Sequence, residues 1–181
     1  MSFQRLKDFL NSKQAKYSFE LHSPAYTALE VAERAHVHGM KLGKVVVVNK
    51  FNEEDLNGEF ALCLLPAHYH IDCDALAKTL AVDEIAISME CDFVHRFPQC
   101  ETGAIPPFSE LWNMPVYMSF AFDMDQDIFF NAGNWSEFVR MPCAEYFRVE
   151  QPQLISEGII APGITPPKVS VRRGREVFRK H

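Results

Sequence analysis

The chain has 181 residues, of which 48% are hydrophobic, 23% are charged and 12% are aromatic. This composition is that of a globular protein about the size of one domain, so it excludes an intrinsically disordered chain and a collagen-like chain. No apolar run reaches the ~18 residues that span a bilayer, and the first residues lack the apolar stretch of a secretory signal. No membrane partner is therefore expected.

The net charge of −6 is distributed unevenly along the chain. Residues 168–181 contain six basic residues and one acidic residue, so this tail carries +5 and leaves −11 for residues 1–167. Basic tails often bind polyanions. A solvated tail without any function explains the same pattern equally well.

Five cysteines occur at irregular spacings, namely Cys63, Cys73, Cys91, Cys100 and Cys143. An odd number without a repeated spacing favours reduced thiols, and with them a cytoplasmic location, over a disulfide framework. Cys63 lies inside an apolar run, and Cys143 lies between a proline and an alanine. Neither has a basic neighbour that would activate a thiolate, so both are expected to be small buried residues.

Apolar periodicity predicts helices and strands from the start of the chain. Residues 3–13 place four apolar side chains on one helical face, and residues 17–21 alternate as in a short strand. Thr27 and Glu30 then match a capping box, in which the Thr27 hydroxyl accepts from the backbone N–H of Glu30 and the Glu30 carboxylate accepts from the backbone N–H of Thr27. A helix over 28–36 is expected to follow it.

The remaining elements are mixed irregularly, which predicts an α/β (α+β) domain with a mixed sheet. The expected strands cover residues 45–48, 60–65, 84–88, 116–122, 127–131 and 135–141. The expected helices cover residues 72–80, 89–97 and 144–149. A turn is expected over 52–59, where Asn57 precedes Gly58, and a loop over 101–113.

The last residues differ in composition from the rest of the chain. They contain four prolines and the basic cluster, and prolines remove backbone donors and disfavour helix in their neighbours. We therefore expect a compact domain over residues 1–150. Residues 151–181 are expected to form an extension, partly extended and partly mobile.

Most catalytic signatures are absent from the sequence. It contains no GxGxxG, Walker, CxxC or GxSxG motif, which removes the usual dinucleotide, phosphate-loop, redox and hydrolase-elbow interpretations. The pair His68 and His70 near Cys73, and the pair His36 and His38, have ligand-type side chains. A metal site needs three or four ligands, and no second cluster supports either pair, so no metal is expected.

Lys44 immediately precedes the four-valine run in the segment KLGKVVVV. An ammonium at the end of a buried strand can face a pocket, where it binds a phosphate or orients a substrate as a point charge. The same pattern is also that of a strand-end lysine whose head group reaches water. The local pattern leaves both interpretations open.

Two glycine-containing segments have the character of pocket walls. In GAIPPF, residues 103–108, Gly103 permits a close backbone approach, and the two prolines stiffen a loop that can present backbone groups to a small polar ligand. In FNAGNWSE, residues 130–137, Gly133 lies between two expected strands among polar side chains. The plainer interpretation of the first segment is an ordinary rigid connection. That of the second segment is a hairpin turn with a packed Trp135.

In this order, the segments HSPAYTALEVAERAHV, KVVVV, LLPAHYHIDCDAL, GAIPPF and FNAGNWSE resemble the YbaK/prolyl-tRNA synthetase-associated editing domain family. The resemblance covers residues 3–150. It implies a mixed β-sheet, curved and partly barrel-like, with helices around it. It also implies hydrolysis in trans of mischarged aminoacyl-tRNA that carries a small amino acid such as Ala, Cys or Ser, with tRNA(Pro)-like substrates foremost.

The resemblance also implies which residues form the site. The family lysine corresponds to Lys44, as the catalytic residue that holds the terminal adenosine phosphate or aligns the ester. The residues implied to bind the substrate are His22, Tyr26, Thr27, Gly103, Ala104, Ile105, Pro106, Pro107, Phe108, Gly133, Trp135 and Ser136. The tail residues expected to hold tRNA electrostatically are Arg172, Arg173, Arg175, Arg179 and Lys180.

The implied chemistry needs no protein nucleophile. An aminoacyl ester is already activated, so hydrolysis needs a positioned water and stabilisation of charge on the carbonyl oxygen. In the family, the terminal hydroxyl of the tRNA assists the water, which agrees with the lack of a Ser-His-Asp or Cys-His arrangement here. The implied partner is the aminoacylated 3′ end of tRNA, a synthetase remains open as a second partner, and no metal or organic cofactor is implied.

Two positions depart from the family pattern. Ser109 follows Phe108 where relatives often carry glycine, and Trp135 stands where they often carry histidine. A bulky indole can shrink the pocket, which puts substrate choice and activity in question. The alternatives are a non-catalytic module of the same fold that binds an aminoacyl group, a nucleotide or a protein, and a hydrolase of another small ester or amide.

Overall fold

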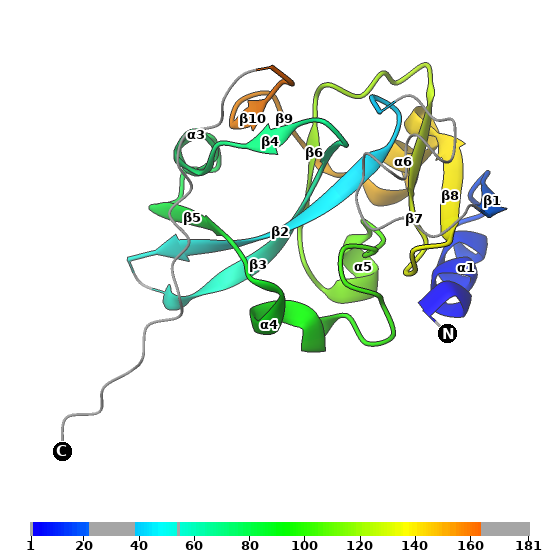
Figure 1. Cartoon of the computed structure of the whole chain (residues 1–181), viewed down its shortest axis with the longest axis horizontal. Helices are drawn as coiled ribbons and strands as arrows, with labels where there is room; N and C mark the ends of the chain where they lie inside the picture. Colours follow the sequence, from blue (N-terminus) through cyan, green and yellow to red (C-terminus); the bar gives the residue numbers. More distant parts are fainter. Residues whose placement is uncertain (1, 22–38, 54, 164–181) are drawn as a thin grey trace.

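The computed structural model of the chain describes residues 2–21, 39–53 and 55–163 as an assembly of short helices around mixed sheets (Figure 1). The first helix, α1, covers Ser2–Ser12, as the periodicity predicted. Its apolar face buries Leu6 and Leu10 completely. The expected helix over 28–36 and its capping box lie outside the described residues.

The larger sheet has five strands in the order β5-β2-β3-β6-β9. Their bounds are β2 Gly43–Asn52, β3 Asp55–Pro66, β5 Glu84–Ile87, β6 Val116–Ser119 and β9 Gln153–Ile155. The β5-β2-β3 pairs are antiparallel, whereas β3-β6 and β6-β9 are parallel. The turn expected over 52–59 is wrong in its extent, because β2 and β3 continue through most of it, with a register shift between Lys50 and Asn52.

A second sheet has three strands in the order β1-β8-β7, all antiparallel. These strands are β1 Ser18–Leu21, β7 Asp127–Asn131 and β8 Glu137–Pro142. A parallel bridge between Leu42 and Phe129 places β7 beside the start of β2. The two sheets therefore meet at the beginning of β2, and together they form the curved, mixed arrangement that was expected.

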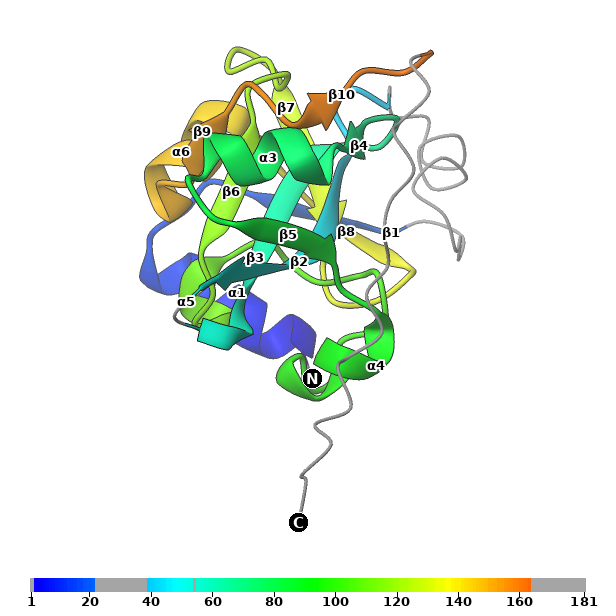
Figure 2. The same cartoon turned by 90° about the vertical axis from the view of Figure 1, so that its left-hand side faces the viewer.

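Short helices cover both sides of the five-stranded sheet (Figure 2). Helix α3, Cys73–Thr79, lies on one side, and Asp72 caps it by accepting from the Ala75 N–H at 3.1 Å. The other helices are α4 Glu90–Phe93, the 3-10 helix η1 Val94–Arg96, α5 Ser109–Trp112 and α6 Cys143–Glu150. All five cysteines are free, and Cys63 and Cys143 are buried, as predicted.

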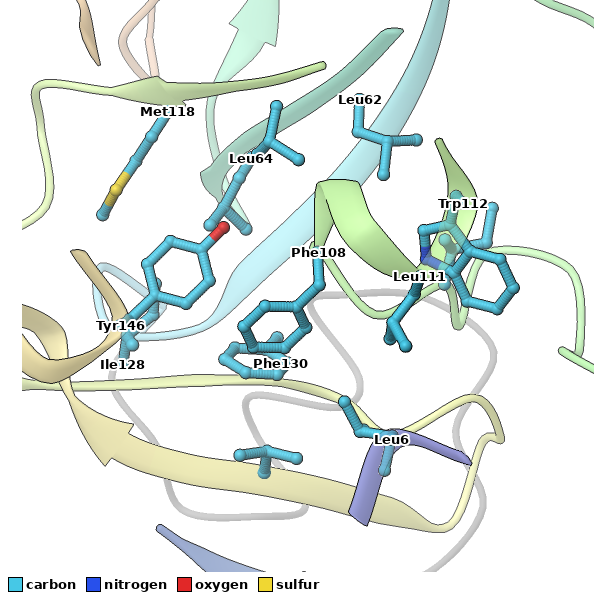
Figure 3. Close-up of a cluster of buried hydrophobic side chains, with 14 of the residues drawn as sticks. Leu6, Leu62, Leu64, Phe108, Leu111, Trp112, Met118, Ile128, Phe130 and Tyr146 are labelled. Atoms are coloured by element: carbon cyan, nitrogen blue, oxygen red, sulfur yellow. The ribbon is translucent and has the colours of Figure 1, made fainter. Parts of the chain in front are cut away.

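Two apolar cores lie on opposite faces of the large sheet. Alternation along β2 sends Val47 into the core that contains α1, α5 and α6, and Val48 into the core beneath α3. In the first core, the rings of Phe108, Phe130 and Tyr146 lie within 5.7 Å of one another, centre to centre (Figure 3). This aromatic cluster fixes the end of the 103–108 loop to the scaffold.

The segment after residue 150 adds one strand to each of two sheets. β9 pairs with β6, and Ile155 on it is only 1% exposed. β10, Ile159–Ile160, pairs with β4, His70–Ile71, in a two-stranded sheet, and the Asp72 N–H donates to the Gly158 carbonyl at 2.9 Å. Residues 153–160 therefore pair with strands of the preceding body. The segment from residue 164 lies outside the described residues.

Candidate functional site

Lys44 is the second residue of β2, opposite Leu65 of β3. Regular alternation directs its side chain to the same face as Val46 and Val48, away from Val47. Burial lowers the pKa of the Lys44 ammonium, and burial together with the charge of Lys44 lowers the pKa of His70. Within the described ranges no carboxylate pairs with the Lys44 ammonium. A half-buried cation without a local counter-charge favours binding of an anion.

The loop over residues 103–108 is anchored at its C-terminal half. The carbonyl of Pro106 accepts from the Trp112 Nε1 at 2.8 Å, and the carbonyl of Pro107 accepts from the Tyr146 hydroxyl at 2.7 Å. Phe108 is fully buried in the aromatic cluster. These groups therefore face the core in this structure, and the expectation that the proline carbonyls and Phe108 contact a ligand stays a prediction.

The exposed part of the loop is the stretch around Gly103. This residue has a φ of +79°, a left-handed conformation that favours glycine. Gly103 is exposed, whereas Ala104 and Ile105 directly after it are buried. The Ala104 N–H donates to the Glu101 carbonyl at 2.9 Å, so the loop closes on itself at this point.

The turn over residues 132–136 is joined to this loop at three points. The Glu101 N–H donates to the Gly133 carbonyl at 2.9 Å, and the Trp135 N–H donates to the Glu101 carboxylate at 2.5 Å. The Trp135 indole packs on Gly103, because a Cβ built there would lie only 2.8 Å from Cη2 of the ring. The structure therefore brings Gly103, Gly133 and Trp135 together, and their role in binding a substrate stays a prediction.

In the turn over residues 132–136, the Asn134 side chain makes hydrogen bonds that stabilise the turn itself. Asn134 accepts from the Ser136 N–H at 2.8 Å through Oδ1 and donates to Glu137 at 2.5 Å through Nδ2. The Asn131 Oδ1 is buried, and within the described ranges it has no hydrogen-bond partner. Because β7 runs parallel to the start of β2, the strand that leads into this turn also passes beside the strand that carries Lys44.

Three substrate-binding residues expected in the first quarter of the chain, His22, Tyr26 and Thr27, lie outside the described residues. So do the tail residues expected to hold tRNA. Sequence reasoning missed Glu101, Trp112 and Tyr146, which hold the two segments in place. No local pattern links Tyr146 to Pro107, 39 residues away, because that hydrogen bond exists only once α6 has packed.

The described residues contain no group of three or more side chains arranged to hold a metal ion. His68 is instead packed against the backbone, since a Cβ on Gly39 would overlap its Nε2 atom. Within the same ranges, none of the helices has both the length and the apolar character needed to cross a membrane.

Comparison with known proteins gives this fold and site a context. The aminoacyl-tRNA editing domain family matches residues 22–149. The multifunctional Ser/Thr-tRNA deacylase ProXp-y of Escherichia coli is 26% identical over 159 residues, which cover 86% of this chain and 92% of that protein. Among solved structures, hypothetical protein APE2540 has a TM-score of 0.73 at 10% identity and covers 84% of this chain and 98% of its own.

A further solved structure, assigned as a trans-editing enzyme for prolyl-tRNA synthetase, has a TM-score of 0.69 at 16% identity. The match covers 87% of this chain and 96% of that one. The two structural matches confirm the expected fold, a mixed α+β body with curved sheets.

The family match identifies the chain as an aminoacyl-tRNA deacylase, the class of enzyme expected from the sequence. The chain belongs to the aminoacyl-tRNA editing domain family. The expected resemblance is confirmed, and aminoacyl-tRNA is the substrate class on which this family acts.

Proposed function

We propose that the protein hydrolyses, in trans, the ester of tRNA mischarged with a small amino acid. Ala, Cys and Ser on tRNA(Pro)-like substrates are the first candidates, and the name of the E. coli relative adds Thr. The observation that supports this most strongly is the joined pair of segments, in which the Trp135 turn closes over Gly103. A closed, glycine-lined wall of this kind suits a small aminoacyl group better than a large one.

In this proposal, Lys44 binds a phosphate of the terminal nucleotides and thereby aligns the ester. Its half-buried ammonium has little water around it, so its attraction for an anion is stronger than that of a surface lysine. The exposed backbone at Gly103 holds the aminoacyl group. Water attacks the ester carbon, the C–O bond to the ribose breaks, and the ribose oxygen leaves with a proton. The protein supplies position and charge, and no covalent intermediate is needed.

The proposal predicts that Lys44→Ala lowers kcat/KM for deacylation about 100-fold, the scale expected when loss of a positioning contact misaligns the reacting groups. The measurement is release of amino acid from Ala-, Cys-, Ser- and Thr-tRNA. Lys41→Ala is the matched control, because it removes a lysine only three residues earlier, outside β2, and leaves intact the backbone carbonyl that accepts from Phe129.

Equal rates for wild type and Lys44→Ala across the panel would remove Lys44 from the mechanism. No turnover of any of these tRNAs by the wild-type protein would refute the proposed activity. In that case a panel of small non-tRNA esters tests a different hydrolase, and tight binding of aminoacyl-tRNA without hydrolysis identifies a binding module of the same fold.

A further inference from the structure

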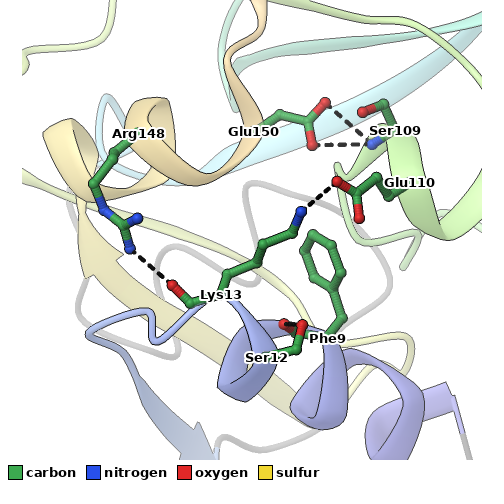
Figure 4. Close-up of polar contacts among 7 residues, drawn as sticks. All are labelled: Phe9, Ser12, Lys13, Ser109, Glu110, Arg148 and Glu150. Atoms are coloured by element: carbon green, nitrogen blue, oxygen red, sulfur yellow. Dashed lines mark hydrogen bonds and ion pairs between the residues drawn. The ribbon is translucent and has the colours of Figure 1, made fainter.

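The loop over residues 103–108 is held from its core side by three side chains that come from two helices. Trp112 of α5 and Tyr146 of α6 each donate to one of the proline carbonyls. The third hydrogen bond comes directly after the loop, where the Ser109 N–H donates to both carboxylate oxygens of Glu150 at 3.1 and 3.0 Å (Figure 4). Of the three, only Glu150 carries a charge that can change.

Glu150 is the last residue of α6, and its side chain is half-buried. It supplies the acceptor that the start of α5 otherwise lacks, because the residue before that helix is Phe108, which makes no capping hydrogen bond. The contact spans 41 residues of sequence, so it ties α6 to the end of the loop. An ionised carboxylate accepts such a hydrogen bond more strongly than a neutral carboxylic acid does.

We propose that Glu150 is a positioning residue of the editing site, which holds the 103–108 loop in place when it is ionised and releases it when it is protonated. This inference rests on the proposed function, since the loop is the wall that would hold the aminoacyl group. Glu150 does not touch the substrate in this scheme. It acts through Ser109 and the two prolines that precede it in the same rigid segment.

The charges around Glu150 allow it to change state near neutral pH. Burial raises its pKa to about 7, against the hydrogen bonds from Ser109, and the nearby Glu110 carboxylate also raises it. Lys13 acts in the opposite direction and is itself ion-paired with Glu110. Tyr146 lies one turn earlier on α6, and its hydroxyl stays protonated, because burial, together with the charge of Glu150, raises its pKa well above the ordinary value.

The sign of the effect follows from these charges. Above about pH 7 the carboxylate is ionised and holds Ser109, and below that pH the loop loses this anchor. The ratio of kcat/KM for wild type to that of Glu150→Gln should therefore rise about three- to tenfold from about pH 5.5 to about pH 8.5, with a midpoint near 7. Taking the ratio removes the intrinsic pH dependence of ester hydrolysis.

Glu145→Gln is the matched control, because it makes the same change on the same helix. Glu145 is paired with Arg148, which holds its pKa at about 2, so it does not titrate in this range. Two further variants should move the midpoint in opposite directions. Glu110→Gln should lower it, and Lys13→Met should raise it. A purely structural role for Glu150 would not respond to these changes.

The chain contains two tryptophans, and both contact the loop: Trp112 binds the Pro106 carbonyl and Trp135 packs on Gly103. Intrinsic fluorescence of Trp135→Phe therefore reports on Trp112 without any assay of activity. Its emission should titrate near pH 7, and the titration should disappear when Glu150→Gln is added.

The two readouts separate the possible failures. A deacylase whose pH profile and fluorescence are unchanged by Glu150→Gln would overturn this inference and leave the proposed function intact. Fluorescence that titrates through Glu150, in a protein that deacylates no tRNA, would refute the proposed function and retain the charge-dependent anchor of the loop.

Discussion

At the scale of single residues, the contact between Gly103 and Trp135 decides the shape of the candidate site. Two independent facts require glycine at this position. The φ of +79° is unfavourable for any side chain, and the indole occupies the place where a Cβ would lie. The contact also shows how Trp135 is accommodated at the position where the resemblance led us to expect histidine: its ring lies on the loop at Gly103.

Gly103→Ala should therefore destabilise the protein by about 1–2 kcal/mol from the left-handed backbone alone, with a further loss from the contact at 2.8 Å. It should also reduce deacylation, since the wall must move. Gly163→Ala is the matched control, because Gly163 has a φ of +86° and a Cβ added to it would meet no atom within 4 Å. Urea unfolding measures both, and equal losses would show that the Trp135 contact is unimportant.

Which side of the loop faces the core is beyond the reach of sequence reasoning. The sequence predicts a rigid segment at Gly103, Pro106 and Pro107. It does not reveal that the proline carbonyls are taken by Trp112 and Tyr146. Those hydrogen bonds form only between elements that pack in three dimensions, so neither spacing nor composition carries a signal for them.

At the scale of elements, β9 is the part of the fold that local patterns conceal. It has three residues, too few for a detectable period of two, and it follows Pro152, which indicates a break. Its place in the sheet is instead set by parallel pairing with β6 and by burial of Ile155 against the core under α3. A proline at the start of an edge strand is compatible with this position.

Ile155→Ala should lower the free energy of unfolding by about 2–5 kcal/mol, the range for truncation of a fully buried aliphatic side chain. Leu154→Ala, the neighbouring residue on the same strand, is 39% exposed and should change it by much less. Thermal or urea unfolding of the two variants makes the comparison. If neither substitution changed the free energy of unfolding, the segment after residue 150 would not stabilise the domain.

The hairpin between β2 and β3 shows the opposite error, a turn signal placed inside a strand. Asn57 and Gly58 are a typical turn pair, yet both belong to β3. Gly58 has a φ of +73°, and the Asn49 side chain fills the space beside it. The left-handed glycine therefore lies within a paired strand and not in a turn between two strands.

At the scale of the whole molecule, charge is the feature that bears most directly on a nucleic-acid substrate. Residues 1–167 carry −11 and residues 168–181 carry +5. Binding of tRNA against the field of an acidic body needs local positive charge, and Lys44 provides only one such group. The tail is therefore expected to supply sequence-independent affinity through phosphate contacts.

Deletion of residues 168–181 should weaken tRNA binding and flatten its dependence on salt. Each phosphate contact adds about 0.7–0.9 to the slope of log K against log salt, so a slope smaller by about 2 or more is expected. Binding titrations at several salt concentrations measure this. Arg172, Arg173 and Arg175 changed together to Gln form the control that keeps the length of the chain, and an unchanged slope in both variants would make the tail a bystander.

The pairing of β1 with β8 has a consequence for how the protein is made. Ser18 of β1 lies opposite Arg140 of β8, so the two paired strands are far apart in the sequence. Closing so long a loop is entropically costly, and contacts of this kind form late in folding. During synthesis β1 stays without its partner until residues 137–142 have left the ribosome, so this sheet cannot be completed before then.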